Sequence, residues 1–418
     1  MREGSEILVV GGGFAGFWAA IAARRVGMSR VSITLVSREP VLQIRPRLYE
    51  AAPELLAVDM VPLLERVNVQ FVQGEAIGID ASTRSVALAD GRVLPYDRLV
   101  VATGSAMRRP PVPGAGEAYS VDSQSEAITF DRRLREIAHG TREPRVAVIG
   151  AGFTGIELAL ELRDRLAAHG GSARAEALQI FLIDRASVVG PELGEGPRPL
   201  IEAALRDARI ECRLAATVSE LSADRVTFAD GSVLDVDAVV LTTGMVAAAF
   251  ARHVPGERDG LGRVVVDRSL RVPAFHDIFV AGDAAAADGG DGHPILQSCQ
   301  HALQAGRFAG ENAARDLLGL PVLEYVQPPY ITCLDLGRSG AVFTRGWDRH
   351  VEKFGSEAKA IKRRINRQTI YPPADATGDE LIALSSLDPA EQRFSRPSPP
   401  ESTRLLSGAT TVSHPSRG

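Results

Sequence analysis

Residues 6–16 read EILVVGGGFAG, and residues 145–155 read RVAVIGAGFTG. In each stretch a short apolar run of β character leads into a glycine-rich turn, and a helical pattern follows. Glycines spaced as GxGxxG between a strand and a helix are typical of a dinucleotide-binding unit. The first glycine makes the tight turn, the second lets the backbone approach a diphosphate, and the third lets helix and strand pack closely. The sequence therefore predicts two nucleotide-binding turns.

A second pair of segments repeats at almost the same distance. Residues 88–104 read LADGRVLPYDRLVVATG, and residues 228–244 read FADGSVLDVDAVVLTTG. The two offsets are 139 (145 − 6) and 140 (228 − 88) residues. This period exceeds the roughly 20–50 residues of solenoids and propellers. We therefore expect a duplicated unit, meaning two homologous nucleotide-binding domains.

Each unit has the same predicted order of elements. A strand, a glycine turn and a helix are followed by a second strand, a hairpin at an Asp-Gly pair and a closing strand that ends in Thr-Gly. Alternating strands and helices predict an α/β fold with parallel sheets. The expected strands are 7–10, 31–36, 146–149 and 178–183, the helices are 14–25 and 153–167, and the hairpins lie at 90–91 and 230–231.

The rest of the chain completes this plan. A buried strand over 277–282 ends in Asp283, a glycine loop spans 289–292, and a helix is expected from 295 to 318. Residues 325–373 predict a small α+β domain with one basic helix. The predicted organisation is a discontinuous first nucleotide-binding domain (1–120 and 265–324), a second nucleotide-binding domain (121–264), a C-terminal interface domain (325–373) and a disordered tail (374–418), which is rich in Pro, Ser and polar residues.

Composition narrows the function classes. The chain has 418 residues, with 45% hydrophobic residues and 24% charged residues, as expected of two or three globular domains. Its net charge of −5 does not indicate a basic surface that binds nucleic acid. Its three cysteines form no CxxC pair, and its eight histidines have no metal-ligand spacing, so no metal is expected. No apolar run reaches the roughly 18 residues of a membrane span, and acidic residues and glycines argue against a signal peptide.

The residue after the second strand differs between the two units. Asp184 ends the second strand of the second unit. A carboxylate at this place accepts hydrogen bonds from the ribose hydroxyls and repels a 2′-phosphate, so NADH is favoured over NADPH. Arg185 follows it and weakens that preference. The equivalent place in the first unit holds Ser37, with Glu39 two residues on. An ordinary strand-end charge remains the alternative interpretation of Asp184.

Two dinucleotide sites in tandem indicate an electron relay, with one fixed cofactor and one exchangeable cofactor. The strand that ends at Asp283 indicates which unit holds the fixed one, because an acid there can bind the ribityl chain of a flavin. On these motifs the chain resembles the two-dinucleotide-binding flavoproteins of the pyridine nucleotide-disulfide oxidoreductase superfamily, and within it the type II NADH dehydrogenases, which are NADH:quinone oxidoreductases. The resemblance covers about residues 5–373 and also rests on IRPRLYEAA (44–52), YDRLVVATG (96–104), VAGDAA (280–285) and CQHALQAG (299–306).

The resemblance implies non-covalent FAD in the first unit and NADH in the second. The FAD residues that it implies are Gly11, Gly12, Gly13, Phe14, Ala15, Gly16, Ser37, Arg38, Arg45, Ala76, Ala102, Thr103, Gly104 and Asp283. The NADH residues that it implies are Gly150, Gly152, Phe153, Thr154, Gly155, Asp184 and Gly244. The chain departs from the family in three places: Ser37 replaces an acid, Cys299 replaces the alanine of the family's AQ motif, and no clear pair of amphipathic membrane helices closes the sequence.

Three residues are candidates for the catalytic centre. The resemblance places Glu157 near the nicotinamide, and it places Gln300 and Gln304, four residues apart on one helix face, at the acceptor pocket. The alternatives are an exposed first-turn acid stabilised by the helix dipole and two solvent-facing polar residues. Cys299 and Cys333 also raise the possibility of sulfur shuttling, as in sulfide:quinone oxidoreductases, although free cysteines are usually buried small hydrophobes.

Three function classes stay open at this point. The first is an NADH:quinone reductase at the membrane surface, the second is a soluble NAD(P)H-dependent flavin reductase with a protein or small-molecule acceptor, and the third is a redox-responsive binding protein. The partners expected are NADH, a small-molecule acceptor and a second copy of the chain. We expect a cytoplasmic protein, with weak peripheral membrane contact through the basic 359–367 segment, for which a solvated surface or dimer contact is the alternative.

Overall fold

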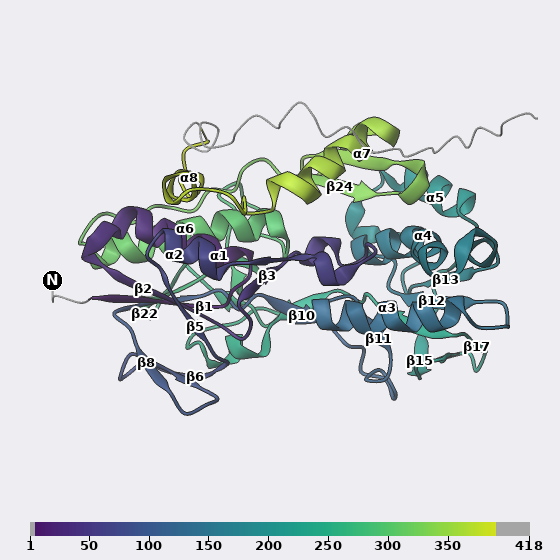
Figure 1. The fold of residues 1–418 in the computed structure, drawn as a ribbon, viewed down its shortest axis with the longest axis horizontal. Coiled ribbons are helices and arrows are strands. Elements are labelled where there is room, and N and C mark those ends of the chain that lie inside the picture. Colours follow the sequence, from purple (N-terminus) through teal and green to yellow (C-terminus); the bar gives the residue numbers. More distant parts are fainter. Residues whose placement is uncertain (1–4, 390–418) are drawn as a thin grey trace, which may run out of the picture.

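Two parallel sheets lie one after the other along the long axis of the molecule (Figure 1). The structure, a computed structural model, describes residues 5–389, and the other residues of the predicted tail lie outside this range. The first sheet has the order β21-β22-β9-β1-β2-β5, and its neighbours are parallel except for β21 and β22. The second sheet, β11-β18-β12-β13-β14, is entirely parallel. The predicted α/β fold with two Rossmann-like units is therefore confirmed.

The strands agree closely with the expected ones. Those of the first sheet are β1 (Glu6–Val10), β2 (Ser32–Ser37), β5 (Gln70–Gln73), β9 (Arg98–Val101), β21 (Arg271–Val272) and β22 (Phe275–Val280). Those of the second sheet are β11 (Tyr119–Ser120), β12 (Arg145–Ile149), β13 (Gln179–Ile183), β14 (Ile210–Arg213) and β18 (Ala238–Leu241). Each unit also carries an antiparallel three-stranded sheet that contains its Asp-Gly hairpin: β6 (Ala76–Asp80), β7 (Ser85–Leu88) and β8 (Val93–Pro95), and β15 (Val218–Leu221), β16 (Arg225–Phe228) and β17 (Val233–Asp235).

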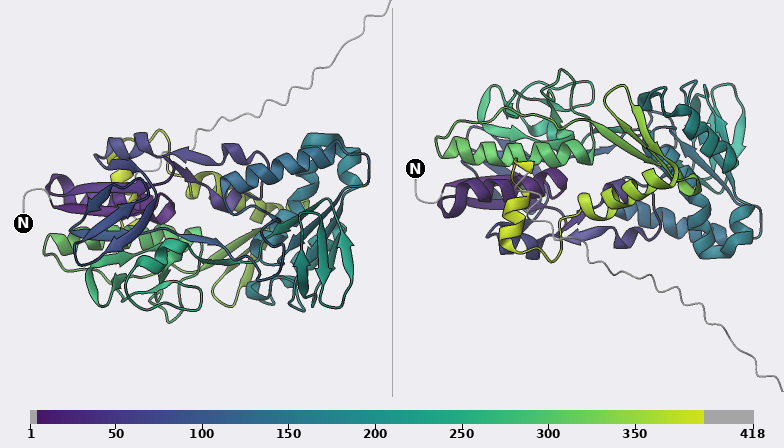
Figure 2. Two further views of the ribbon diagram at one scale, coloured as in Figure 1. Left: turned by 90° about the horizontal axis from the view of Figure 1, so that it is seen from below. Right: turned by 90° about the horizontal axis from the view of Figure 1, so that it is seen from above.

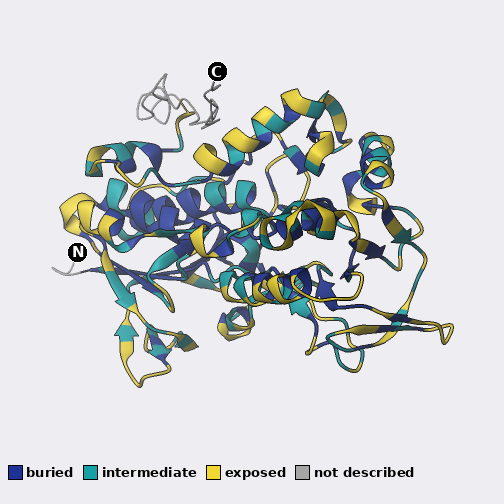
Figure 3. Cartoon of the chain, turned by 45° about the vertical axis from the view of Figure 1, so that its right-hand side comes forward, coloured by how far each residue is buried: buried dark blue, intermediate teal, exposed yellow. Residues whose placement is uncertain are grey.

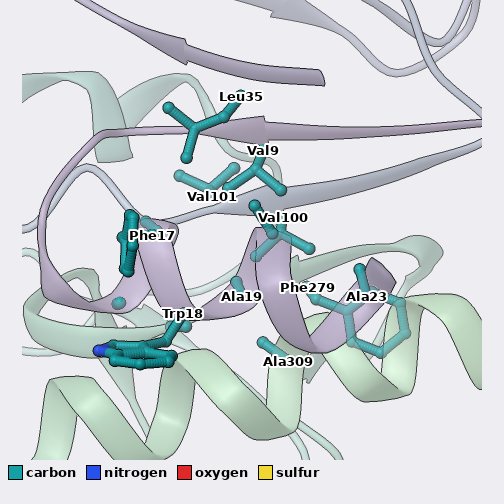
Figure 4. Packing of buried hydrophobic residues seen from close by; sticks show 14 of the residues in the cluster. Val9, Phe17, Trp18, Ala19, Ala23, Leu35, Val100, Val101, Phe279 and Ala309 are labelled. Carbon is teal, nitrogen blue, oxygen red and sulfur yellow. The ribbon is translucent and has the colours of Figure 1, made fainter. Parts of the chain in front are cut away.

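Helix α1 (Phe14–Gly27) lies between the first sheet and helix α6 (Cys299–Leu317) (Figure 4). Its apolar side chains fill the space beneath the strands, and Phe17 and Ala19 are fully buried. Two glycines of α6 set the distance between the helices, because a Cβ atom at Gly306 would lie 2.2 Å from the Ala15 carbonyl oxygen and one at Gly310 would lie 2.0 Å from that of Ala19. The two helices therefore pack backbone against backbone.

Two helices differ from their predicted bounds. Helix α4 (Phe153–Glu176) continues past the predicted end at residue 167, with a break at Gly171, where φ is +79°. Helix α6 begins at Cys299 rather than at residue 295, because the Ser298 hydroxyl caps it by accepting the His301 N–H. The other helices of the first two units are α2 (Val61–Arg66), α3 (Gln124–Ala138) and α5 (Arg198–Asp207).

The two units are joined in two ways. The connecting segments pair as an antiparallel ribbon of β10 (Ser105–Met107) and β19 (Met245–Ala247). The guanidinium of Arg165 on α4, which is fully buried, donates to the Asp131 carboxylate at 3.0 Å and to the backbone oxygen of Tyr49 in the first unit at 3.3 Å. A buried charge therefore spans the junction between the units.

A third, smaller part lies over this junction (Figures 1 and 2). Strands β24 (Ile331–Asp335), β25 (Ala341–Arg345) and β26 (His350–Phe354) form an antiparallel sheet that packs on α7 (Gly355–Arg364), and a π-helical turn over Ile365–Thr369 continues that helix. This arrangement matches the small α+β domain that was predicted. In Figure 3 the molecule is coloured by burial; β24 and β25 carry mostly buried residues, whereas most of α7 is intermediate or exposed.

The predicted domain boundaries need two corrections. Strand β11 pairs with β18, so the second unit begins before residue 121. Residues 374–389 are folded rather than disordered, because α8 (Gly378–Leu384) has a capping box between Thr377 and Glu380 and packs on α1 and α2. Arg66 holds the start of this segment by donating to the Ala374 and Ala376 carbonyl oxygens. The other boundaries remain predictions.

We expect Leu381→Ala to lower the free energy of unfolding by about 2–5 kcal/mol, because Leu381 on α8 is fully buried and its truncation leaves a cavity. Asp379→Ala on the exposed side of the same helix should cost less than about 1 kcal/mol. Denaturant unfolding of the two variants measures the difference. Equal stabilities would show that α8 does not pack on the first unit.

Candidate active site

Both glycine turns lie at the carboxyl ends of parallel strands, where ligands bind in open α/β sheets. Gly11 has φ of +116°, and a Cβ atom there would lie 2.3 Å from the Ala102 carbonyl oxygen. Gly150 repeats this geometry, with φ of +110° and a distance of 2.5 Å to the Thr242 carbonyl oxygen. Only glycine fits at these two points. No side chain caps α1 or α4, whose first N–H groups are therefore free to bind a diphosphate.

One cavity of about 2570 Å³ connects the two turns. Its volume exceeds the roughly 300–1000 Å³ of a single small-molecule site, so it has room for two dinucleotides. All but two of the predicted site residues line it. They are Gly11, Gly12, Gly13, Phe14, Ala15, Ser37, Arg38, Arg45, Ala76, Ala102, Thr103, Gly104, Gly150, Gly152, Phe153, Thr154, Glu157, Asp184, Gly244, Asp283, Gln300 and Gln304.

The two exceptions are the third glycines of the turns. A Cβ atom at Gly16 would lie 1.7 Å from the Gly11 carbonyl oxygen, and one at Gly155 would lie 1.8 Å from that of Gly150. Both glycines lie behind the turn, where they permit helix and strand to pack closely. Their role is therefore structural, as the motif predicts, and neither faces the cavity.

The Asp283 side chain fits the predicted contact with a flavin ribityl chain. Its Oδ2 accepts from the Ser105 hydroxyl at 2.6 Å, and its buried Oδ1 has no hydrogen-bond partner among the described residues. The buried Thr103 hydroxyl is unpartnered within the same range. Burial raises the pKa of Asp283, and the Ser105 hydrogen bond opposes that shift. Two buried polar groups are thus left for hydroxyl groups of a ligand.

The residues at the two predicted ribose-binding positions differ in their contacts. Asp184 accepts the Ala151 N–H at 2.6 Å and the Ala186 N–H at 2.8 Å, so its carboxylate is held against the second glycine turn. In the first unit the Ser37 side chain lies beside Gly12, and the Glu39 carboxylate accepts from the Gln43 amide at 2.8 Å. Arg185 is exposed at the rim of the cavity beside Asp184.

Glu157 is buried, which rules out an exposed first-turn acid. Its Oε1 lies 2.8 Å from Lys362 Nζ on α7 and accepts the Asp335 N–H at 2.8 Å. Burial raises the pKa of Glu157 to about 7, while Lys362 opposes the shift. Burial lowers the pKa of Lys362, but the Glu157 carboxylate outweighs it and raises that pKa above its ordinary value. A buried ion pair therefore joins the second unit to the C-terminal part at the cavity wall.

The acceptor end of the cavity combines apolar and polar side chains. Gln300 and Gln304 are half-buried on α6, and the Gln300 amide donates to the Pro329 carbonyl oxygen at 3.4 Å. Apolar side chains from α6, from β24 and from the segment that follows α7 line the same cavity: Leu303, Ile331, Ile365 and Ile370.

Both candidate cysteines line the cavity, but burial favours the protonated thiol over the thiolate in each of them. Burial raises the pKa of Cys299 to about 11 and that of Cys333 to about 12. Cys333 Sγ lies 3.7 Å from the Ala358 carbonyl oxygen. Protonated thiols are poor nucleophiles, so these cysteines serve as small apolar wall residues.

The basic helix differs from its predicted surface role. Lys362 is buried in the ion pair with Glu157, and Lys359 is paired with Asp335. Only the arginines of this segment, Arg363, Arg364 and Arg367, remain exposed. Neither lysine is therefore available to bind a lipid headgroup. No helix within residues 5–389 combines the length and apolar character that a membrane span requires.

One group of aromatic and charged residues that lines the cavity was not predicted from the sequence. Tyr330 and Trp347 stack with ring centroids 4.5 Å apart, and the Arg349 guanidinium lies 4.4 Å from the other face of Tyr330. Trp347 also donates to the Asp291 carboxylate at 2.8 Å. These residues come from the β25–β26 turn and from loops, where no periodicity marks them.

The chain matches the family described as pyridine nucleotide-disulphide oxidoreductase over residues 5–306. It is 39% identical over 394 residues to the NADH dehydrogenase-like protein MT1860 of Mycobacterium tuberculosis, an alignment that covers 91% of this chain and 98% of the relative. It is 28% identical to the demethylphylloquinone reductase NdbB of Synechocystis, with 81% and 86% covered. The solved structure of NDH2 from Plasmodium falciparum in complex with NADH covers 92% of this chain and 97% of its own, with a TM-score of 0.75 and 12% identity, and therefore supports the fold.

The chain therefore belongs to the pyridine nucleotide-disulphide oxidoreductase family. It is an oxidoreductase, and FAD and NADH, the cofactors predicted, are those of this family. The residues on the two turns fit these groups, because the cavity is large enough for both, the turns exclude a Cβ atom, and Asp283 presents an unpartnered oxygen. The binding roles of the individual residues remain predictions.

We expect Gly13→Val to lose bound flavin without loss of folding. No atom lies within 4 Å of a Cβ at Gly13, so valine fits the protein but occupies the space into which a diphosphate would come. The flavin-to-protein ratio and the thermal unfolding midpoint of the flavin-depleted protein measure the two effects. Gly260→Val is the matched control, since Gly260 has equally open surroundings and lies outside the cavity. Full flavin content in Gly13→Val would move the FAD site away from the first unit.

Proposed function

We propose that the chain passes a hydride equivalent from NADH, through FAD, to a quinone. The observation that carries this proposal is the acceptor end of the cavity, where Gln300 and Gln304 lie among apolar side chains. Side chains that line a cavity suit a small ring better than a protein acceptor. The names of the relatives MT1860 and NdbB, an NADH dehydrogenase-like protein and a demethylphylloquinone reductase, support it.

In this proposal the second unit binds and orients NADH. The backbone N–H groups at the start of α4 bind the diphosphate, and Asp184 binds the adenosine ribose. FAD, when bound in the first unit, supplies the group that accepts the hydride and returns the two electrons. The protein contributes orientation and electrostatics, since hydride transfer needs no protein acid or base. The start of α6 faces the cavity and would stabilise negative charge there.

Glu157 and Lys362 have a different role in the proposal. Reduction of a quinone to a quinol requires protons. This buried pair lines the same cavity as the two glutamines, and Glu157 can hold a proton near neutral pH. We assign Glu157 to the supply of a proton at the acceptor, and Lys362 to holding its carboxylate in place. Glu157 is thus not needed for the transfer of hydride itself.

A soluble NAD(P)H-dependent flavin reductase with a protein or other small-molecule acceptor is the alternative. Steady-state turnover of the FAD-loaded chain with a panel of quinones, small dyes and redox proteins separates the two. Fast turnover with a protein acceptor and none with any quinone would favour the alternative. Absence of turnover with every acceptor would favour a binding protein that responds to reduction by NADH.

The proposal includes weak attachment to a membrane. The exposed arginines at the end of α7 form a small basic surface, and charges at such a surface are screened over about 10 Å at 0.1 M salt. A salt wash should therefore release the protein from vesicles that contain anionic lipid. A homodimer and a cytoplasmic location are further parts of the proposal.

NADH should be a better donor than NADPH, because the Asp184 carboxylate would face the 2′-phosphate. We expect this preference to be worth roughly 1–3 kcal/mol in kcat/KM. Asp184→Asn removes the charge and keeps an acceptor for one of the two backbone N–H groups that Asp184 binds, so it should narrow the preference. Arg185→Ala should widen it instead. Equal kcat/KM for both donors in the unaltered protein would contradict the assignment.

Gln300→Phe should lower kcat/KM for quinone about tenfold or more, since a bulky ring would fill the acceptor end of the cavity. Stopped-flow reduction of the flavin by NADH should stay nearly unchanged. Gln368→Phe is the control, because Gln368 is exposed and does not line the cavity. A Gln300 variant that matches the unaltered protein at limiting quinone would rule out this acceptor site.

A further inference from the structure

The turn between β25 and β26 contacts both nucleotide-binding units at the wall of the cavity. On one side, Trp347 stacks on His293 with ring centroids 4.5 Å apart and donates to Asp291, and both of these residues belong to a loop of the first unit. On the other side, Arg349 donates from Nη2 to the backbone oxygen of Glu192 in the second unit at 3.2 Å. The C-terminal part of the chain therefore bridges the two units at this turn.

The rings at this turn are occupied by one another. Trp347 is stacked with both His293 and Tyr330, and the Arg349 guanidinium covers the Tyr330 ring. Tyr330, Trp347 and Arg349 all line the cavity. Because the ring faces are engaged, the group that this wall offers to a ligand is the guanidinium.

The second unit makes room for Arg349 with two glycines. A Cβ atom at Gly194 would lie 3.1 Å from Arg349 Cγ, and one at Gly196 would lie 3.0 Å from the Arg349 carbonyl oxygen. Arg349 itself has φ of +58°, in the left-handed region that residues with a side chain rarely adopt. Such a backbone persists where the surrounding structure holds it, and it is common at ligand sites. The position of this guanidinium is therefore closely specified.

The contacts that hold the Arg349 guanidinium carry no formal charge. Arg349 is only 8% exposed, and the guanidinium contacts a carbonyl oxygen and an aromatic ring. Its buried Nη1 has no hydrogen-bond partner within residues 5–389. Burial of a cation is costly unless an anion compensates for it. The site therefore suits a ligand that brings a negative charge.

The neighbours of Arg349 indicate which part of a ligand this would be. Arg349 contacts Glu192, and Glu192 Oε1 lies only 2.7 Å from the place where a Cβ atom of Gly152 would be. Gly152 directly precedes α4, whose first N–H groups have no side-chain cap and form the predicted diphosphate site. The exposed Glu192 carboxylate would repel a diphosphate at this place, and Arg349 supplies the opposite charge.

We propose that Arg349 binds the diphosphate of NADH, so that the C-terminal part of the chain completes the nucleotide site of the second unit. The guanidinium and the N–H groups at the start of α4 are then two sets of donors to the phosphate oxygens. This inference rests on the proposed binding of NADH in the second unit. Because NADH and NADPH share the diphosphate, Arg349 raises the affinity for both and leaves the choice between them to Asp184.

The test measures the binding of ADP-ribose, which carries the diphosphate and has no nicotinamide, to the full-length, FAD-loaded chain. Arg349→Met keeps the aliphatic stem that packs on Gly194 and removes the charge. It should weaken ADP-ribose binding about tenfold or more in calorimetric titrations, as expected for the loss of a charged hydrogen bond. Adenosine, which has no phosphate, should bind equally to both proteins.

Stopped-flow reduction of the flavin gives a second readout. The concentration of NADH that gives half of the maximal rate should rise in Arg349→Met by a factor similar to that for ADP-ribose. The maximal rate itself should stay nearly unchanged, because Arg349 holds the diphosphate and not the nicotinamide. NADPH should be weakened by the same factor as NADH.

Three variants serve as controls. Arg349→Lys retains the positive charge and should recover much of the affinity. Glu192→Gln removes the opposing carboxylate and should strengthen ADP-ribose binding about two- to fivefold. Arg345→Gln changes an exposed arginine of the same hairpin, which is paired with Glu352 and lies outside the cavity, and it should leave the affinity unaltered.

Several outcomes would overturn this assignment. One is equal binding of ADP-ribose by Arg349→Met and the unaltered protein. Another is an equal loss of ADP-ribose and adenosine binding, which would show that Arg349 only maintains the shape of the site. If Arg349→Met does not fold, Glu192→Gln decides, and an unchanged affinity for ADP-ribose in that variant would count against the assignment.

The other source of a negative charge in the cavity is the acceptor. A quinone that carries a carboxylate and its neutral analogue test this source. If Arg349→Met lowers kcat/KM for the carboxylated quinone alone and binds ADP-ribose normally, Arg349 belongs to the acceptor site and the assignment to NADH is wrong.

Failure of the proposed function gives a different result. If the unaltered protein binds ADP-ribose, loses that binding in Arg349→Met and reduces no quinone, the proposed acceptor is wrong while the role of Arg349 stands. If the unaltered protein binds neither ADP-ribose nor NADH, the proposed nucleotide site fails, and the role of Arg349 fails with it.

Discussion

The contact between the first glycine of each turn and a carbonyl oxygen of a neighbouring strand is the constraint on which the site depends. Gly11 lies against Ala102, and Gly150 lies against Thr242, at distances that leave no space for a Cβ atom. Because the turn and the neighbouring strand are this close, the chain turns directly from the sheet into the helix. The first N–H groups of α1 and α4 therefore lie at the same edge of each sheet as the carboxyl ends of β9 and β18. Any side chain at either glycine would separate helix from sheet and close the place for a diphosphate.

This constraint is local, which explains why so much of the fold could be predicted from the sequence. The glycine motif, the strand before it and the helix after it lie within a few residues of each other. The same pattern occurs twice in the sequence, which makes a chance match less probable. The short helix α8 was missed because the composition around it, rich in Pro and Ser, resembles that of an unfolded segment. Its Thr377–Glu380 capping box is visible in the sequence, but the buried positions of Leu381 and Leu384 depend on α1 and α2, far away along the chain.

The same distinction applies to the candidate site. Apart from Gly16 and Gly155, the predicted site residues, such as Asp184, Asp283 and Gln300, line the cavity. Lys362 could not be identified, because its basic neighbours gave it the pattern of a surface helix and its partner Glu157 lies in another domain. Removal of one member of a buried ion pair typically costs about 3–5 kcal/mol, since the other charge is left without compensation. The position of α7 over the junction is therefore fixed by chemistry that periodicity does not reveal.

The buried guanidinium of Arg165 has a consequence for the way in which nucleotides exchange. Together with its contacts to Asp131 and the Tyr49 backbone, it ties the second unit to the first at the junction, and the Glu157–Lys362 pair ties the second unit to the part above it. A hinge motion that opened the two units would break the hydrogen bond from Arg165 to the Tyr49 carbonyl oxygen and would leave a buried guanidinium donor without that partner. A bound nucleotide would therefore leave more readily at the rim of the cavity than by opening of this junction. Its residence time would then be governed by the side chains and loops at that rim, while the spacing between the two cofactor sites stays constant through the cycle.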